Sequence, residues 1–136
     1  MKRIVTFISI IFTLFINAQQ KVIDSLEREL LNPTNGLSKV EVLNWLSYYY
    51  ARSNPEKGLD KIDEAIKLAE KTKDSLQLGI AYEYKGLNYK SLGNDSLAFS
   101  FYDKAEDIYK LIDSTRALSI LRLNKGLFYA QRSNHH

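Results

Sequence analysis

The sequence predicts an all-α protein built from antiparallel helix-pair repeats, with about six helices after an export signal. Gly and Pro are sparse, with six Gly and two Pro in 136 residues. Apolar residues recur at helical spacing, for example at Ile62, Ala65, Ile66 and Ala69. Segments about 40 residues apart also align in register, and such a fixed period is the mark of a repeat protein.

Residues 1–18 have the organisation of a secretory signal peptide. Two basic residues follow Met1, and residues 4–16 contain no charge. Ala18 then supplies the small residue after which such signals are cut. The apolar run is shorter than the ~20 residues of a membrane helix. We therefore expect an exported protein, periplasmic or secreted, that is cleaved after Ala18. Contact with a membrane is expected only if this segment stays uncleaved.

The remaining chain divides into a leading helix and three repeat units. Residues 19–37 form the leading helix and a linker, in which Pro33 and Gly36 end the helical pattern. Residues 38–73 form the first repeat and residues 74–112 the second. Residues 113–136 form the first helix of an incomplete third repeat.

Capping residues indicate where the helices begin. Ser38 with Glu41 predicts a capping box. Asn54 before Pro55 predicts a capped helix with proline at its first position. Three aspartates precede further helical segments, and we expect each to accept amide hydrogen bonds there: Asp74, Asp95 and Asp113.

The same residue types recur at matching positions of the three units. Ser47, Gly86 and Gly126 are small, and they follow one another at an interval of about 40 residues. A small residue is needed on each side where two helix backbones approach closely, so we expect Gly86 to face Ala98. Larger side chains fill the space beside such contacts. The residues expected to pack the repeats together are Ser47, Tyr50, Gly58, Ala65, Gly86, Tyr89, Ala98, Tyr102, Ala105, Gly126 and Tyr129.

These offsets resemble those of the tetratricopeptide repeat (TPR) family. The second unit carries the family's small, aromatic, Ala, aromatic and Ala positions at Gly86, Tyr89, Ala98, Tyr102 and Ala105. The period exceeds the family's ~34 residues by about six, and the extra length falls at the joints between units. Armadillo and HEAT repeats have periods near 40–47 residues, but the offsets favour TPR. The resemblance implies a TPR-like α-solenoid.

The chain also resembles the exported N-terminal repeat domain of bacterial sensory proteins, including histidine kinases. That resemblance rests on residues 24–26, 43–47 and 53–57. In those proteins a membrane helix and a histidine kinase or DNA-binding domain follow the repeats, and neither is found in this sequence. The alternative prediction is therefore a truncated input domain of a longer membrane sensor, without an independent function.

The TPR resemblance also implies a binding surface. In that family the first helices of successive units line a concave groove, which holds a peptide or a partner helix. We therefore predict a non-catalytic scaffold that binds another protein or a peptide. The residues implied to line the groove are Asn44, Tyr48, Ala51, Glu83, Leu87, Lys90, Leu123, Leu127 and Ala130.

Composition argues against other classes of function. There is no Cys, and the two His are the terminal His135 and His136, so we predict no catalytic residue, metal or cofactor. Loss of the two basic residues with the signal lowers the net charge from +3 to +1, which disfavours nucleic acid as a partner. Three consecutive tyrosines, residues 48–50, point in different directions on a helix and cannot form one stacking platform. The carboxylates of residues 60–70 alternate with lysines, which predicts an ion-paired, solvated face rather than a hydrolase site.

The last unit lacks its second helix, because only two residues follow Ser133-Asn134. Leu123, Leu127 and Phe128 would then lack the cover that a capping helix normally gives a repeat array. We predict that the protein is marginally stable or associates with itself through this final helix.

Overall fold

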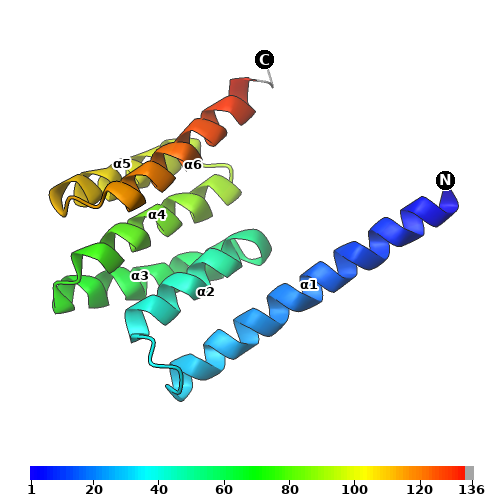
Figure 1. Ribbon diagram of the computed structural model, residues 1–136, viewed down its shortest axis with the longest axis horizontal. Helices are drawn as coiled ribbons and strands as arrows, with labels where there is room; N and C mark the ends of the chain where they lie inside the picture. The colour runs from blue at the N-terminus through cyan, green and yellow to red at the C-terminus, as the bar shows by residue number, and fades with distance from the viewer. Residues whose placement is uncertain (134–136) are drawn as a thin grey trace.

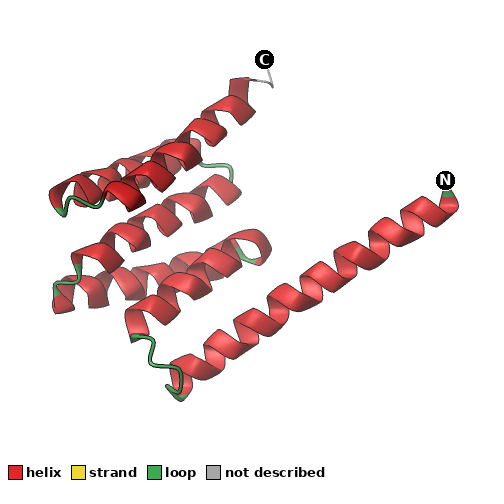
Figure 2. Ribbon diagram, in the orientation of Figure 1, coloured by secondary structure: helices red, strands yellow, loops and turns green. Residues whose placement is uncertain are grey.

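A computed structural model describes residues 1–133, which form six α-helices and no strand (Figures 1 and 2). The prediction of an all-α fold is confirmed. The connections are short, as in the one-residue turn at Asn54, so successive helices fold back on one another. The helices are α1 (Lys2–Leu31), α2 (Lys39–Ser53), α3 (Pro55–Thr72), α4 (Ser75–Ser91), α5 (Asp95–Leu111) and α6 (Thr115–Ser133).

The leading helix is longer than expected. It was predicted from residue 19, but α1 runs without a break from Lys2 to Leu31, because no Gly or Pro interrupts this stretch. The large apolar side chains described between residues 4 and 16 are 50–66% exposed, whereas Ile23 is 1% exposed. The N-terminal half of α1 accordingly extends away from the other helices (Figure 1). None of the helices in residues 1–133 is long and apolar enough to cross a membrane.

Three of the predicted helix starts have the expected geometry. The Ser38 hydroxyl accepts from the Glu41 amide, and the Glu41 carboxylate accepts from the Ser38 amide, which completes the capping box. The Asn54 side chain caps α3, with Pro55 at its first position. Asp74 caps α4 by accepting from the backbone amide of Gln77.

Two of the predicted caps are wrong. Asn94, and not Asp95, caps α5, and Asp95 becomes the first helical residue. Both side chains are good N-caps, so spacing alone did not separate them. Asp113 lies in the turn before α6 with a φ of 54°, in the left-handed region that Asp tolerates better than most residues. The helix begins two residues later, at Thr115.

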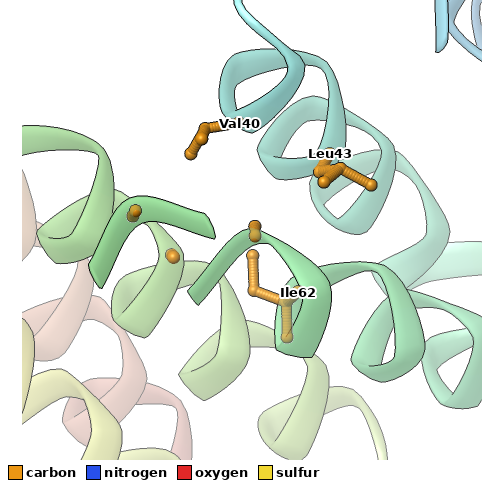
Figure 3. Packing of buried hydrophobic residues seen from close by; sticks show 6 residues of the cluster. Val40, Leu43 and Ile62 are labelled. Atoms are coloured by element: carbon orange, nitrogen blue, oxygen red, sulfur yellow. The ribbon is translucent and has the colours of Figure 1, made fainter. Parts of the chain in front are cut away.

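The core forms where successive helices pack. One cluster joins α1 and α2 around Ile23 and Leu46, and a second joins α2, α3 and α4. Figure 3 shows Val40 and Leu43 of α2 facing Ile62 of α3 in the second cluster. A third joins α5 and α6. Each pair of helices thus buries apolar side chains against the neighbouring helices, an arrangement consistent with helical repeats.

Gly86 lies where α4 and α5 approach closely. A Cβ at Gly86 would lie 2.9 Å from the backbone oxygen of Ala98 and 2.7 Å from the ring of Tyr102. The equivalent Gly126 differs from the expectation, since a Cβ there would have no neighbour within 4 Å. Tyr129 is likewise 56% exposed and stacks on Phe99, with ring centroids 4.5 Å apart. The third unit therefore lacks the close contact of the second.

The other predicted packing residues lie in two environments. Tyr89 is partly buried and stacks on Phe101, with ring centroids 5.5 Å apart. The remainder are buried: Ser47, Tyr50, Gly58, Ala65, Ala98, Tyr102 and Ala105.

Gly58 meets a side chain from the next unit. A Cβ at this position would overlap Asn88 Oδ1 and lie 3.2 Å from the backbone oxygen of Ser47. The amide of Asn88 is fully buried and donates to Ser47 Oγ at 2.9 Å and to the backbone oxygen of Tyr84 at 2.8 Å. Because Gly58 has no side chain, it leaves room for the Asn88 amide, which joins α4 to α2 by its hydrogen bond to Ser47.

Two ion pairs recur at matching positions of successive units. Lys85 of α4 bonds Asp63 of α3 at 2.6 Å, and Lys125 of α6 bonds Asp103 of α5 at 2.7 Å. In both pairs the lysine follows the aspartate by 22 residues. Two of the first helices, α4 and α6, therefore make the same polar contact with the helix that precedes them.

The ion pairs of Lys125 predict a measurable dependence of stability on pH. Hydrogen bonds from Lys125 and Lys110 hold the pKa of Glu106 at about 2, below its ordinary 4.5. Since the pKa is lower in the folded state, the ionised carboxyl stabilises the fold above pH 4.5, and this contribution is lost as the pH falls towards 2. The substitution Lys125→Met should therefore flatten the acid side of the stability profile in urea unfolding. Lys67→Met, at an exposed position of α3, is the control and should keep the wild-type slope. Equal slopes in all three proteins would contradict the prediction.

Candidate functional site

The described residues contain a hollow of about 260 Å³ between α2, α4 and α6, which we call the main hollow because most of the predicted groove residues line it. Five of the residues predicted to line a groove lie in it: Tyr48, Glu83, Leu87, Lys90 and Leu127. They come from three helices that are far apart in the sequence, α2, α4 and α6. The other lining residues are Arg52, Tyr84, Tyr102, Asn124 and Gln131.

Four predicted groove residues do not line the main hollow. Asn44 is 2% exposed because its amide faces α4, where it donates to the side-chain oxygen of Gln77 at 2.9 Å. Ala51 is buried, while Leu123 is 62% exposed and lies outside the lining. Ala130 is exposed and also lies outside the lining.

Two lining residues that the sequence prediction missed follow from helical geometry. Arg52 and Gln131 each lie four residues, about one turn, beyond a correctly placed residue, Tyr48 and Leu127 respectively. A period of four applied to the predicted positions would have found them. Tyr102 lines the hollow from α5. It could not be predicted in the same way, because the prediction considered only the first helix of each unit.

Glu83 lines the main hollow, and its buried carboxylate is hydrogen-bonded to two other helices. Glu83 of α4 accepts a hydrogen bond from the Tyr109 hydroxyl of α5 at 2.9 Å, and another from the Asn124 amide of α6 at 3.1 Å. Burial raises the pKa of Glu83, while the two hydrogen bonds act in the opposite direction. The pKa of Tyr109 is also raised, first by burial and then by the neighbouring Glu83 charge. This carboxylate therefore links three helices.

A second hollow of about 300 Å³ lies on the other side of Glu83. Glu83 and Tyr84 line both hollows. The second hollow is bounded by Leu76 and Ile80 of α4 and by the start of α6: Arg116, Ala117 and Ile120. Along α4, the residues that line the second hollow and then the main hollow run from Leu76 to Lys90. Along α6 they run in the same order, from Arg116 to Gln131. The two hollows therefore lie end to end between these helices. Figure 1 shows α4 and α6 running in the same direction.

The charged rim of the main hollow is positive. Among the residues whose side chains the structure describes, no carboxylate lies within ion-pair distance of Arg52 or Lys90. Lys90 instead places its ammonium 4.7 Å from the centre of the Phe128 ring. The one carboxylate of the lining, Glu83, already holds two donors.

The other chemical candidates have structural partners. Asp63 and Glu64 are exposed on α3, but they pair with lysines of neighbouring helices and not with those of α3 as predicted: Asp63 with Lys85 of α4 at 2.6 Å, and Glu64 with Lys39 of α2 at 2.7 Å. Tyr50 is buried and donates to Glu27 Oε1 at 3.0 Å. Within the described part of the chain, no three His, Cys, Asp or Glu lie close enough to hold a metal ion. His135 and His136 lie outside the described residues.

Comparisons of this chain with protein-family models, with curated proteins and with solved structures found no match.

Proposed function

We propose that this protein is an exported, non-catalytic scaffold of TPR-like repeats, which binds a segment of another protein or a peptide in the main hollow. The observation that carries the proposal is that residues from α2, α4 and α6, chosen from the sequence as groove residues, converge on one hollow. Apolar, aromatic and charged side chains meet there, as they do in sites that bind helical or extended segments.

Two contacts between helices support the interpretation of the chain as TPR-like repeats. The small residue Gly86 lies against the backbone of Ala98, at the offset that the family uses. The Asp–Lys pairs that join successive units recur at the same spacing of 22 residues. The recurring ion pairs support the proposal that the unit of about 40 residues is a structural repeat as well as a sequence repeat.

Exposure of the N-terminal segment supports export. A helix buried in a folded domain hides one apolar face, whereas the large apolar side chains described between residues 4 and 16 are all exposed. The first buried residue of the described side chains is Ile23, five residues beyond the expected cleavage site at Ala18. Cleavage there would remove the exposed apolar part and leave the packed part of α1. The alternative, the input domain of a longer sensor, remains a prediction and would use the same hollow.

The experiment is selection from a displayed library of random 16-residue peptides, followed by affinity measurements on the selected sequences by fluorescence anisotropy. Leu87→Asp places a charge in the apolar wall of the main hollow, and we expect affinity to fall at least tenfold. Leu97→Asp is the matched control, because Leu97 is exposed on α5 outside both hollows. Unchanged binding by Leu87→Asp, or equal losses in both variants, would contradict the proposal.

A further inference from the structure

The space between α4 and α6 is longer than the main hollow alone. The two hollows lie end to end and are divided by the hydrogen bond between Glu83 and Asn124. We call this space the α4–α6 seam, formed by the residues that line the two hollows. Ile120 and Leu127 border it with about half of each side chain exposed, so the seam is open to a partner.

Cations without acidic partners stand at both ends of the seam. Lys90 and Arg52 lie at one end, and Arg116 lies at the other. Among the described side chains, no carboxylate pairs with any of these three. The sequence of α6, residues 115–133, contains no Asp or Glu but four basic residues: Arg116, Arg122, Lys125 and Arg132. Of these, Arg122 and Lys125 pair with acids of α5, whereas Arg116 lines the seam.

The length of the seam follows from helix geometry. Arg116 precedes Asn124 by eight residues on α6, and Lys90 follows Glu83 by seven residues on α4. At 1.5 Å per residue these segments span about 12 and about 10 Å. The two cationic ends are therefore about 22 Å apart, which is the length of about 15 helical residues.

We propose that the partner is an amphipathic helix of about four turns, with an apolar stripe between acidic residues near each end. Its apolar side chains would enter the two hollows on either side of Glu83, each of which has room for about one large side chain. Its acidic ends would meet Arg116 at one end and Lys90 with Arg52 at the other. This inference rests on the proposed function and specifies the partner.

The test uses three synthetic 18-residue peptides with one apolar stripe and different end residues: Glu, Gln or Lys. Their affinities for the purified protein are measured by anisotropy at low and at physiological salt. We expect the Glu-ended peptide to bind about tenfold more tightly than the Gln-ended one, and this preference should weaken with added salt. The Lys-ended peptide should bind most weakly.

The variant Arg116→Glu/Lys90→Glu should reverse the order, so that the Lys-ended peptide binds best. Such a gain of binding cannot come from a protein that has simply unfolded. Lys67→Glu on α3 is the control and should leave the order unchanged.

Equal binding of the three peptides would overturn the acidic preference of the seam but would leave binding in the main hollow intact. Failure of the library selection, in contrast, would contradict the proposed function itself. Absence of binding by all three peptides would also overturn the inference. So would a dimer of the wild-type protein that the double variant converts to monomers, because the seam would then bind a second copy of this chain.

Discussion

Replacing Gly86 with valine is expected to lower the free energy of unfolding by about 3 kcal/mol. The new Cβ would lie 2.9 Å from the carbonyl oxygen of Ala98. Because that oxygen belongs to the backbone of α5, it can move only with the helix. The Tyr102 ring at 2.7 Å blocks the other direction. Urea unfolding followed by circular dichroism measures the loss.

The matched control is the same substitution at the equivalent position of the next unit. Gly126 has nothing within 4 Å of a built Cβ. Valine is a better helix former than glycine, so Gly126→Val should be neutral or raise stability by about 0.4 kcal/mol. Similar losses at both positions would contradict the contact between α4 and α5 described above.

A second large effect is expected at Gly58. Alanine there would place its Cβ on top of Asn88 Oδ1. To make room, Asn88 would have to give up its buried hydrogen bonds to Ser47 and Tyr84. We expect Gly58→Ala to cost about 2–3 kcal/mol, even though alanine favours the helix.

A double-mutant cycle separates this clash from a general loss of packing. Asn88→Ala alone should be destabilising, because it leaves Ser47 Oγ without its donor. In the Gly58→Ala/Asn88→Ala variant the clash is absent, so the total loss should fall short of the sum by about 1 kcal/mol or more. Simple additivity would show that Gly58 and Asn88 do not interact as described.

Local features of the fold were predictable from sequence because they depend on neighbouring residues. The capping box of Ser38 and Glu41 needs only two side chains three residues apart. The start of the leading helix was harder, since a signal cleavage site is defined by side-chain size and need not break a helix. Nothing between residues 4 and 31 stops α1, and it therefore continues through Ala18.

Contacts between units were predictable only where the repeat recurs. The position of Gly86 follows from its offsets, but the role of Gly58 depends on Asn88, a side chain from the next unit. Asn44 is buried for a similar reason, since Gln77 of α4 covers it. The second hollow of the α4–α6 seam was not predicted, because it depends on how far the start of α6 lies from α4. The Glu83 hydrogen bonds to Tyr109 and Asn124 hold these helices at that spacing.

Amide chemical-shift mapping tests the central claim, binding in the main hollow, most directly. The ¹⁵N-labelled protein is titrated with the tightest peptide from the library, and shifts are assigned residue by residue. The proposal predicts that the largest shifts cluster at Tyr48, Leu87, Lys90 and Leu127, which come from three helices but line one hollow. Shifts confined to α3, or spread evenly over the protein, would contradict it.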